Sequence, residues 1–198
     1  MTNILILGAN GQIARVATDL FLKQTDARLT LYLRNSRRLK SPGYADRVRA
    51  VEGDVLDAKA LEAAMDGQDV VYANLAGDLE QQAECIVKAM GKVGIKRLIF
   101  ISSMGIYDEV AGEHHGSILD PYRKAAAIIE ASALEYTLIR PAWLSDRNEI
   151  AYGMTQKGEP FKNASAQVSR KSVADLVVKL AVTPGLEIRS SLGVHKTP

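Results

Sequence analysis

Residues 3–14 of this chain read NILILGANGQIA, and this short stretch decides the fold. The continuously apolar run from Ile4 to Leu7 predicts a strand that is covered on both faces. Gly8 and Gly11 then predict a sharp turn, and the amphipathic segment 13–22 predicts a helix. A strand, a glycine turn and a helix in this order are typical of a phosphate cradle, because the helix N-terminus presents free N–H groups and the positive end of its dipole. We therefore expect the pyrophosphate of a dinucleotide to bind here.

Each small residue of this turn has an expected role. Gly8 allows the tight turn, Gly11 leaves room for the phosphates, and Ala14 lets the helix pack closely on the strand. The neighbouring residues that we expect in the same cofactor site are Asn10, Gln12 and Ile13. The stretch lacks the lysine and the Ser/Thr of a P-loop, which disfavours a nucleoside triphosphatase.

Composition narrows the class of protein further. The chain has 198 residues, 47% of them hydrophobic and 24% charged, which fits one globular core. A net charge of +2 favours neither nucleic acid nor a membrane surface as a partner. The sequence shows no signal-peptide pattern and no apolar run long enough to span a bilayer, so a cytoplasmic protein is expected.

Cysteine and histidine usage argues against a metal site. The single cysteine, Cys85, excludes an internal disulfide and a cysteine-rich metal site, and it falls on the apolar side of a predicted helix. His114 and His115 are adjacent and lack the i,i+4 spacing that would bring two imidazoles to one metal. We expect Cys85 in the core and no bound metal.

Strand-like and helical patterns alternate along most of the chain, which predicts one α/β domain spanning residues 1–198. Its fold class is a Rossmann-like, doubly wound and mainly parallel sheet with helices on both faces. The predicted strands are Asn3–Leu7, Arg28–Leu33, Val48–Glu52, Asp69–Ala73, Arg97–Ser102, Tyr136–Arg140 and Ser190–His195. The predicted helices are Gln12–Gln24, Ala58–Met65, Leu79–Val93, Pro121–Ala133 and Ser172–Ala181, with Asp57 and Asp120 as expected N-caps.

The segment 143–168 loses this alternation, and Lys157–Pro160 marks a turn inside it. We expect it to cover the carboxyl ends of the strands, where ligands bind in such sheets. Trp143 begins the segment as either a wall of the substrate pocket or a hydrophobic anchor for the loop. The anchor is the preferred interpretation.

The end of the second predicted strand indicates which dinucleotide binds. A site selective for NAD usually has an acid about 20 residues after the glycines, whereas this chain has Arg34-Asn35-Ser36-Arg37-Arg38. Guanidinium groups hold a 2′-phosphate by charge-assisted hydrogen bonds, so Arg34 and Arg37 are its expected ligands, with Ser36 as a further donor. NADP(H) is therefore favoured over NAD(H). The alternative is a solvated basic loop.

Two further strand ends are expected in the same site. Asp54 could accept a hydrogen bond from the adenine amino group while Val55 packs on the ring, although Asp54 could also be a turn residue. After the fourth strand, the small residues allow the backbone to approach the cofactor. The residues expected there are Asn74, Ala76 and Gly77.

With these pieces the sequence resembles the short-chain dehydrogenase/reductase superfamily, most closely its atypical NAD(P)H-binding members grouped with NmrA-like proteins and biliverdin/flavin reductases. The resemblance covers nearly the whole chain. Its marks, besides the glycine turn, are Gly53-Asp54, Asn74–Gly77, Ile101–Ser103, Tyr122–Lys124, Ile139–Ala142, Val168–Arg170 and Ser172–Asp175.

The resemblance implies a serine, a tyrosine and a lysine in catalysis, and Ser103 and Lys124 stand at the matching places. The tyrosine position, four residues before the lysine, holds Asp120, so Tyr122 and Tyr107 are the candidate phenols. Tyr122 and Lys124 point to nearly opposite sides of a regular helix, at about 100° per residue. One interpretation is a Ser103/Tyr122/Lys124 triad, and another is Lys124 as a ribose-binding residue alone.

Other strand ends complete the expected cofactor site. Ser102 precedes the candidate serine, and the backbone of Pro141 and Ala142 could contact the nicotinamide carboxamide or form a plain turn. We expect an NADP(H)-dependent oxidoreductase acting on an unknown small substrate, with an aromatic or quinonoid compound as one option. The alternative is a non-catalytic redox sensor of the NmrA-like type, and an epimerase is less favoured. A homodimer is implied by the superfamily alone.

Overall fold

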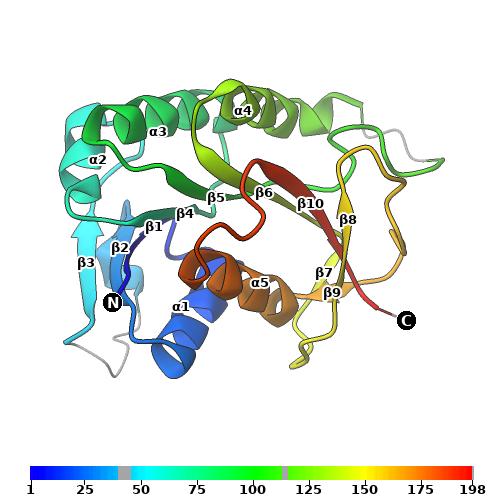
Figure 1. The fold of residues 1–198 in the computed structure, drawn as a ribbon, viewed down its shortest axis with the longest axis horizontal. Helices are drawn as coiled ribbons and strands as arrows, with labels where there is room; N and C mark the ends of the chain where they lie inside the picture. Colours follow the sequence, from blue (N-terminus) through cyan, green and yellow to red (C-terminus); the bar gives the residue numbers. More distant parts are fainter. Residues whose placement is uncertain (40–45, 113–115, 198) are drawn as a thin grey trace.

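The computed structural model describes residues 1–39, 46–112 and 116–197 (Figure 1). Within these residues an eight-stranded sheet has the order β3-β2-β1-β4-β5-β6-β10-β8, and all pairs are parallel except β10 with β8. Its strands are β1 Asn3–Leu7, β2 Arg28–Leu33, β3 Val48–Glu52, β4 Val70–Ala73, β5 Arg97–Ile101, β6 Glu135–Pro141, β8 Gly153–Gln156 and β10 Ser190–His195. The strand order reverses between β1 and β4, which confirms the doubly wound, Rossmann-like fold expected from the sequence.

Helices cover both faces of the sheet (Figure 1). The helices are α1 Gln12–Gln24, α2 Ala58–Met65, α3 Leu79–Val93, α4 Asp120–Ala131 and α5 Arg170–Val182. Successive strand residues point to opposite faces, so Ile4 and Ile6 pack with α1 and α5, whereas Leu5 and Leu7 pack with α2, α3 and α4. Cys85, which was expected in the core, is only partly buried and packs against the second of these clusters.

The two expected N-caps have different outcomes. The Oδ1 atom of Asp57 accepts hydrogen bonds from the amides of Lys59 and Ala60, so it caps α2 as predicted. The prediction for Asp120 is wrong, because α4 already begins at Asp120 and the N-cap position falls on Leu119. The Asp120 carboxylate accepts a hydrogen bond from Arg123 instead.

The segment 143–168 contains short strands that the sequence did not reveal. These are β7 Leu144–Ser145 and β8, and β9 Val168–Ser169 follows at the end of the segment. β7 pairs with β9 in a separate two-stranded sheet. Strands of two to four residues are too short to show an alternation of apolar and polar residues.

None of the helices in the described ranges is long and apolar enough to cross a membrane. The same residues contain no group of His, Cys, Asp and Glu that could hold a metal ion. His114 and His115, for which we expected no metal binding, lie outside the described residues.

Candidate functional site

Two cavities lie at the carboxyl ends of the parallel strands, where the strand order reverses. The large cavity has a volume of about 720 Å³, and the small cavity has a volume of about 330 Å³. Asn74 and Leu75, which follow β4, line both cavities. The two cavities therefore form one cleft along the edge where dinucleotides bind in such sheets.

The glycine turn of residues 8–11 lies beneath this cleft. Gly8 has a φ of +73°, and a Cβ there would lie 2.2 Å from the backbone oxygen of Asn74. A Cβ on Gly11 would lie 1.9 Å from Nδ2 of the same asparagine. The two glycines thus let Asn74 approach the turn, a role that sequence reasoning missed because it assigned the space at Gly11 to phosphate alone.

The N-terminus of α1 offers unused hydrogen-bond donors to the cleft. Its N-cap is Gly11, which has no side chain to cap the helix, and the first turn carries no acid. By contrast, α2, α3 and α5 are capped by the side chains of Asp57, Asp78 and Ser169. The first amides of α1 are therefore available to an anion, and they fit a pyrophosphate.

The small cavity collects many of the residues expected to bind the cofactor, including those of the glycine turn. Those that line it are Gly8, Asn10, Gly11, Asn74 and Ala76, together with Arg34, Asp54 and Val55. Gly77 does not line either cavity, and Asn10 accepts hydrogen bonds from Arg15.

The Asp54 loop is held by its own hydrogen bonds. The Oδ1 atom of Asp54 accepts a hydrogen bond of 3.0 Å from the amide of Leu56, and its backbone oxygen accepts one of 2.9 Å from Tyr32. Burial, followed by the charges of Asp57 and Asp54, raises the pKa of Tyr32 to about 12, so this phenol stays protonated and keeps donating. Asp54 is thus a turn residue that also faces the cavity.

The basic loop after β2 contains an unexpected acid. Glu52, at the end of β3, accepts hydrogen bonds of 3.1 and 2.8 Å from the amide and hydroxyl of Ser36. These bonds, followed by the charge of Arg37, lower the pKa of Glu52. The expectation that Ser36 donates to a 2′-phosphate is corrected accordingly, because its hydroxyl is engaged by Glu52. Arg34 lines the small cavity, whereas Arg37 is exposed and does not line it.

The large cavity holds further expected cofactor residues together with the candidate catalytic serine and tyrosine. The expected residues that line it are Gln12, Ile13, Asn74, Ser102, Ser103, Tyr122, Pro141 and Ala142. The Ser103 hydroxyl donates to the backbone oxygen of Met104 at 3.0 Å, so it is folded back on its own loop. The Ser102 hydroxyl is buried and has no hydrogen-bond partner among the described residues.

Lys124 and Tyr107 lie away from the large cavity. The Nζ atom of Lys124 donates a 2.7 Å hydrogen bond to Glu80 on α3, and this contact raises the pKa of the exposed lysine. The Tyr107 hydroxyl contacts Glu130 and Ser191, and burial raises the pKa of this phenol well above its usual value. The structure thus brings Ser103 and Tyr122 to one cavity without Lys124, and Tyr107 cannot serve there as a proton donor.

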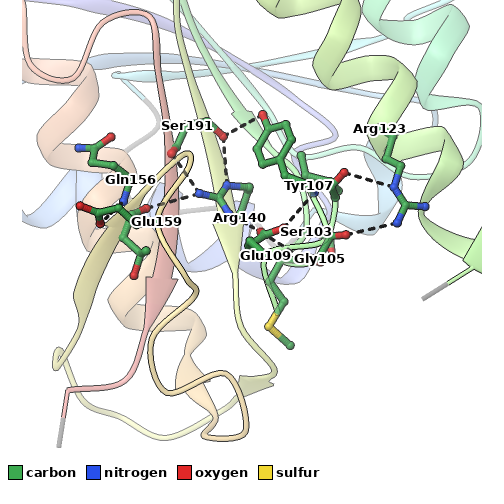
Figure 2. Close-up of polar contacts among 12 residues, drawn as sticks. Ser103, Gly105, Tyr107, Glu109, Arg123, Arg140, Gln156, Glu159 and Ser191 are labelled. Carbon is green, nitrogen blue, oxygen red and sulfur yellow. Dashed lines mark hydrogen bonds and ion pairs between the residues drawn. The ribbon is translucent and has the colours of Figure 1, made fainter. Parts of the chain in front are cut away.

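A buried ion pair supports the loop that carries Ser103, as Figure 2 shows. Arg140 on β6 is fully buried and pairs with the nearly buried Glu109. Glu109 also accepts hydrogen bonds of 3.1 and 2.9 Å from the amides of Gly105 and Tyr107. Sequence reasoning missed this pair. An arginine at the end of the apolar strand Tyr136–Arg140 could have indicated a buried charge that needs a carboxylate partner.

Arg123 holds the same loop from the side of α4 (Figure 2). It donates to the backbone oxygens of Ile106 and Gly105, and to Gly116 at the start of the turn before α4. The loop from Ser103 to Glu109 is therefore fixed to both β6 and α4.

Trp143 lines the large cavity and is 57% exposed, which fits a wall of the pocket better than the preferred interpretation of a hydrophobic anchor for the loop. Ile118, which lines the same cavity, is 75% exposed. Arg170 at the start of α5 also lines the cavity and was quoted only as a mark of resemblance.

Fold and site together define a dinucleotide-binding α/β protein of the short-chain dehydrogenase/reductase type. The family model described as NAD(P)H-binding matches residues 8–184, and the chain belongs to this family. This match confirms the assignment to the atypical NAD(P)H-binding group that the sequence motifs indicated.

Solved structures agree with this assignment. A Rossmann-fold NAD(P)-binding family protein from Shigella flexneri is 45% identical, with 99% of this chain and 94% of that chain covered and a TM-score of 0.87. A short-chain dehydrogenase/reductase from Veillonella parvula DSM 2008, solved in complex with NADP, is 31% identical. The match covers 98% of this chain and 94% of the Veillonella chain, with a TM-score of 0.88.

A curated relative carries a different activity in its name. It is an uncharacterised sugar epimerase, YhfK, from Bacillus subtilis (strain 168), and it is 29% identical over 191 residues. The match covers 88% of this chain and 86% of the relative.

Proposed function

We propose that this protein is an NADP(H)-dependent reductase that passes a hydride to a small planar substrate, aromatic or quinonoid in character. The observation that carries the proposal is the size and position of the large cavity. It adjoins the small cavity at Asn74 and Leu75, and its volume of about 720 Å³ leaves space for a nicotinamide and for a second molecule beside it.

In this proposal the chain's own residues bind and orient the cofactor. The amides at the start of α1 hold the pyrophosphate, Val55 packs on the adenine, and Arg34 with Arg37 binds the 2′-phosphate. Pro141 and Ala142 border the nicotinamide position at the end of β6. When bound, the nicotinamide supplies the hydride.

The position of Lys124 indicates which class of substrate the site can reduce. An alcohol or sugar oxygen needs a positioned proton donor and acceptor, which the superfamily builds from a tyrosine beside a lysine. Here Lys124 contacts Glu80 instead. A quinone or flavin spreads the added charge over its ring and takes its proton from water, so it does not need that pair. This contrast supports a reductase over a sugar epimerase, the activity in the name of the Bacillus relative.

A redox sensor is the second candidate, and the geometry at Ser103 favours it. The hydroxyl of Ser103 is bonded to Met104 and Lys124 lies elsewhere, so the catalytic triad of the superfamily is not assembled. A sensor would bind NADPH and NADP⁺ with different affinities and turn over neither.

One assay separates these candidates. Oxidation of NADPH is followed at 340 nm with flavins, quinones, biliverdin, dichlorophenolindophenol and simple aldehydes, and with a nucleotide sugar in a separate epimerisation assay. We expect turnover with at least one conjugated acceptor and none with the nucleotide sugar. Tight cofactor binding without any turnover would support the sensor, and epimerisation would support the activity named for the relative.

The preference for NADP(H) is tested by removing the two arginines after β2. The double variant Arg34→Ala/Arg37→Ala is expected to bind NADPH at least about tenfold more weakly, because hydrogen bonds between charged groups are lost. NADH affinity should stay unchanged. The matched control is Arg28→Ala, which removes an exposed arginine from the opposite end of β2. Equal losses for NADPH and NADH in isothermal titration would contradict the role of the two arginines.

A further inference from the structure

The large cavity has a strongly asymmetric charge. Among the described residues that line it, Arg170 is the only charged side chain, and no aspartate or glutamate is among them. A guanidinium without a carboxylate on the same wall attracts an anion, and the attraction is stronger in a partly enclosed site than in bulk water. The cavity is therefore suited to a ligand that carries a negative group.

The guanidinium of Arg170 has hydrogen-bond donors that are free to bind such an anion. Its side chain is only 18% exposed, and among the described residues its one hydrogen-bond partner is Asp146, at 2.8 Å. Its Nε atom is buried and has no hydrogen-bond partner in the part of the chain that the structure describes. A guanidinium carries five N–H donors in a fork that matches a carboxylate, so most of its capacity is unused.

The contact with Asp146 does not block this use. The Asp146 side chain is 87% exposed, so water and salt screen part of its attraction to Arg170. A ligand carboxylate can take over the guanidinium with little loss, since Asp146 remains solvated.

The other lining residues of the cavity include large apolar and aromatic side chains. Trp143 and Ile118 expose large apolar surfaces at the cavity, and Tyr122 lies within it. Exposed apolar side chains gathered at a concave site indicate a surface that a ligand covers. A flat conjugated ring fits against Trp143 and Tyr122.

We infer that the substrate carries a carboxylate or an equivalent anion on a planar conjugated body, and that Arg170 binds this anion. The inference rests on the proposed function and deepens it, because it assigns a chemical class to the substrate. Arg170 is then a specificity-determining residue, and it selects acidic substrates over neutral ones of the same shape.

The test uses a matched pair of probes, anthraquinone-2-carboxylate and its methyl ester. Trp143 is the only tryptophan of the chain and lines the cavity, so quenching of its fluorescence reports binding directly. Titrations are made on the full chain with and without NADP⁺, which cannot donate a hydride. We expect the acid to bind about tenfold more tightly than the ester, as an added charge-assisted hydrogen bond predicts.

Three variants locate the source of this difference. Arg170→Gln should abolish it, and Arg170→Lys should retain part of it. Lys171→Gln is the matched control: it removes the adjacent positive charge, which contacts Asn148 and does not line the cavity, and should leave the difference intact. Thermal unfolding and NADPH affinity, measured on each variant, check that the fold and the cofactor site are preserved.

Several outcomes would overturn the inference. These are equal affinities of acid and ester in the unmodified protein, quenching by neither probe, a difference that survives Arg170→Gln, or a difference that Lys171→Gln also removes. An Arg170→Gln variant that loses only NADPH affinity would assign the guanidinium to the cofactor instead. NADPH turnover is measured separately. If NADPH is turned over but acid and ester bind equally, the reductase proposal stands and the anion site is rejected. If the acid binds more tightly but no acceptor is reduced, the anion site stands and the reductase proposal is rejected.

Discussion

Replacing Glu109 with alanine is expected to lower the free energy of unfolding by about 3–5 kcal/mol, as breaking a buried ion pair does in other proteins. Arg140 is fully buried, so without Glu109 its guanidinium would keep its charge in the interior with no carboxylate to balance it. The amides of Gly105 and Tyr107 would lose their acceptor as well. Urea unfolding of the variant and of the unmodified protein measures the loss.

The control for this prediction is a surface ion pair of the same kind. Glu80→Ala removes the exposed partner of Lys124 and is expected to cost less than about 1 kcal/mol. If the two substitutions cost the same, the Arg140–Glu109 pair is not the support that the structure indicates. The double variant Arg140→Met/Glu109→Leu, which leaves no charge unpaired, is expected to be more stable than Glu109→Ala alone.

This ion pair also shows where reasoning from sequence stops. The apolar run that contains Arg140 predicts a strand, and β6 is that strand. The partner of Arg140 lies 31 residues away in a loop, and no periodic pattern links the two positions. Contacts between residues far apart in the sequence depend on the packed structure. Sequence patterns therefore predicted the strand but not the ion pair that holds the loop carrying Ser103.

The parallel strands of the central sheet were predictable because each combines a clear pattern of apolar residues with local boundary signals, whereas the antiparallel edge strand β8 was not. The parallel strands β1–β6 and the helices between them lie within a few residues of their predicted positions. The parallel arrangement then brings the strand ends to one edge, which is why Gly8, Asp54 and Asn74 were expected together and line one cavity.

Two contacts at the site lie beyond the reach of sequence patterns. The loop after β2 carries no acid of its own, but the register of β2 with β3 places Leu33 opposite Glu52, and Glu52 engages Ser36. Lys124 was expected near the cofactor from a spacing typical of the superfamily, whereas its side chain contacts Glu80 on α3. Both contacts join elements that come together only in the folded protein.

Gly8→Ala is expected to weaken NADPH binding by at least about tenfold and to destabilise the fold. The new Cβ would lie 2.2 Å from the backbone oxygen of Asn74, so Asn74, which follows β4 and lines both cavities, would have to move. The matched control is Gly94→Ala: Gly94 has a φ of +84°, and apart from its chain neighbours no described residue has an atom within 4 Å of the added Cβ. The control should cost about 1–2 kcal/mol, the price of a left-handed alanine, with NADPH affinity unchanged. If both variants bind NADPH equally well, the close approach of Asn74 to the turn is not what shapes the cofactor cleft.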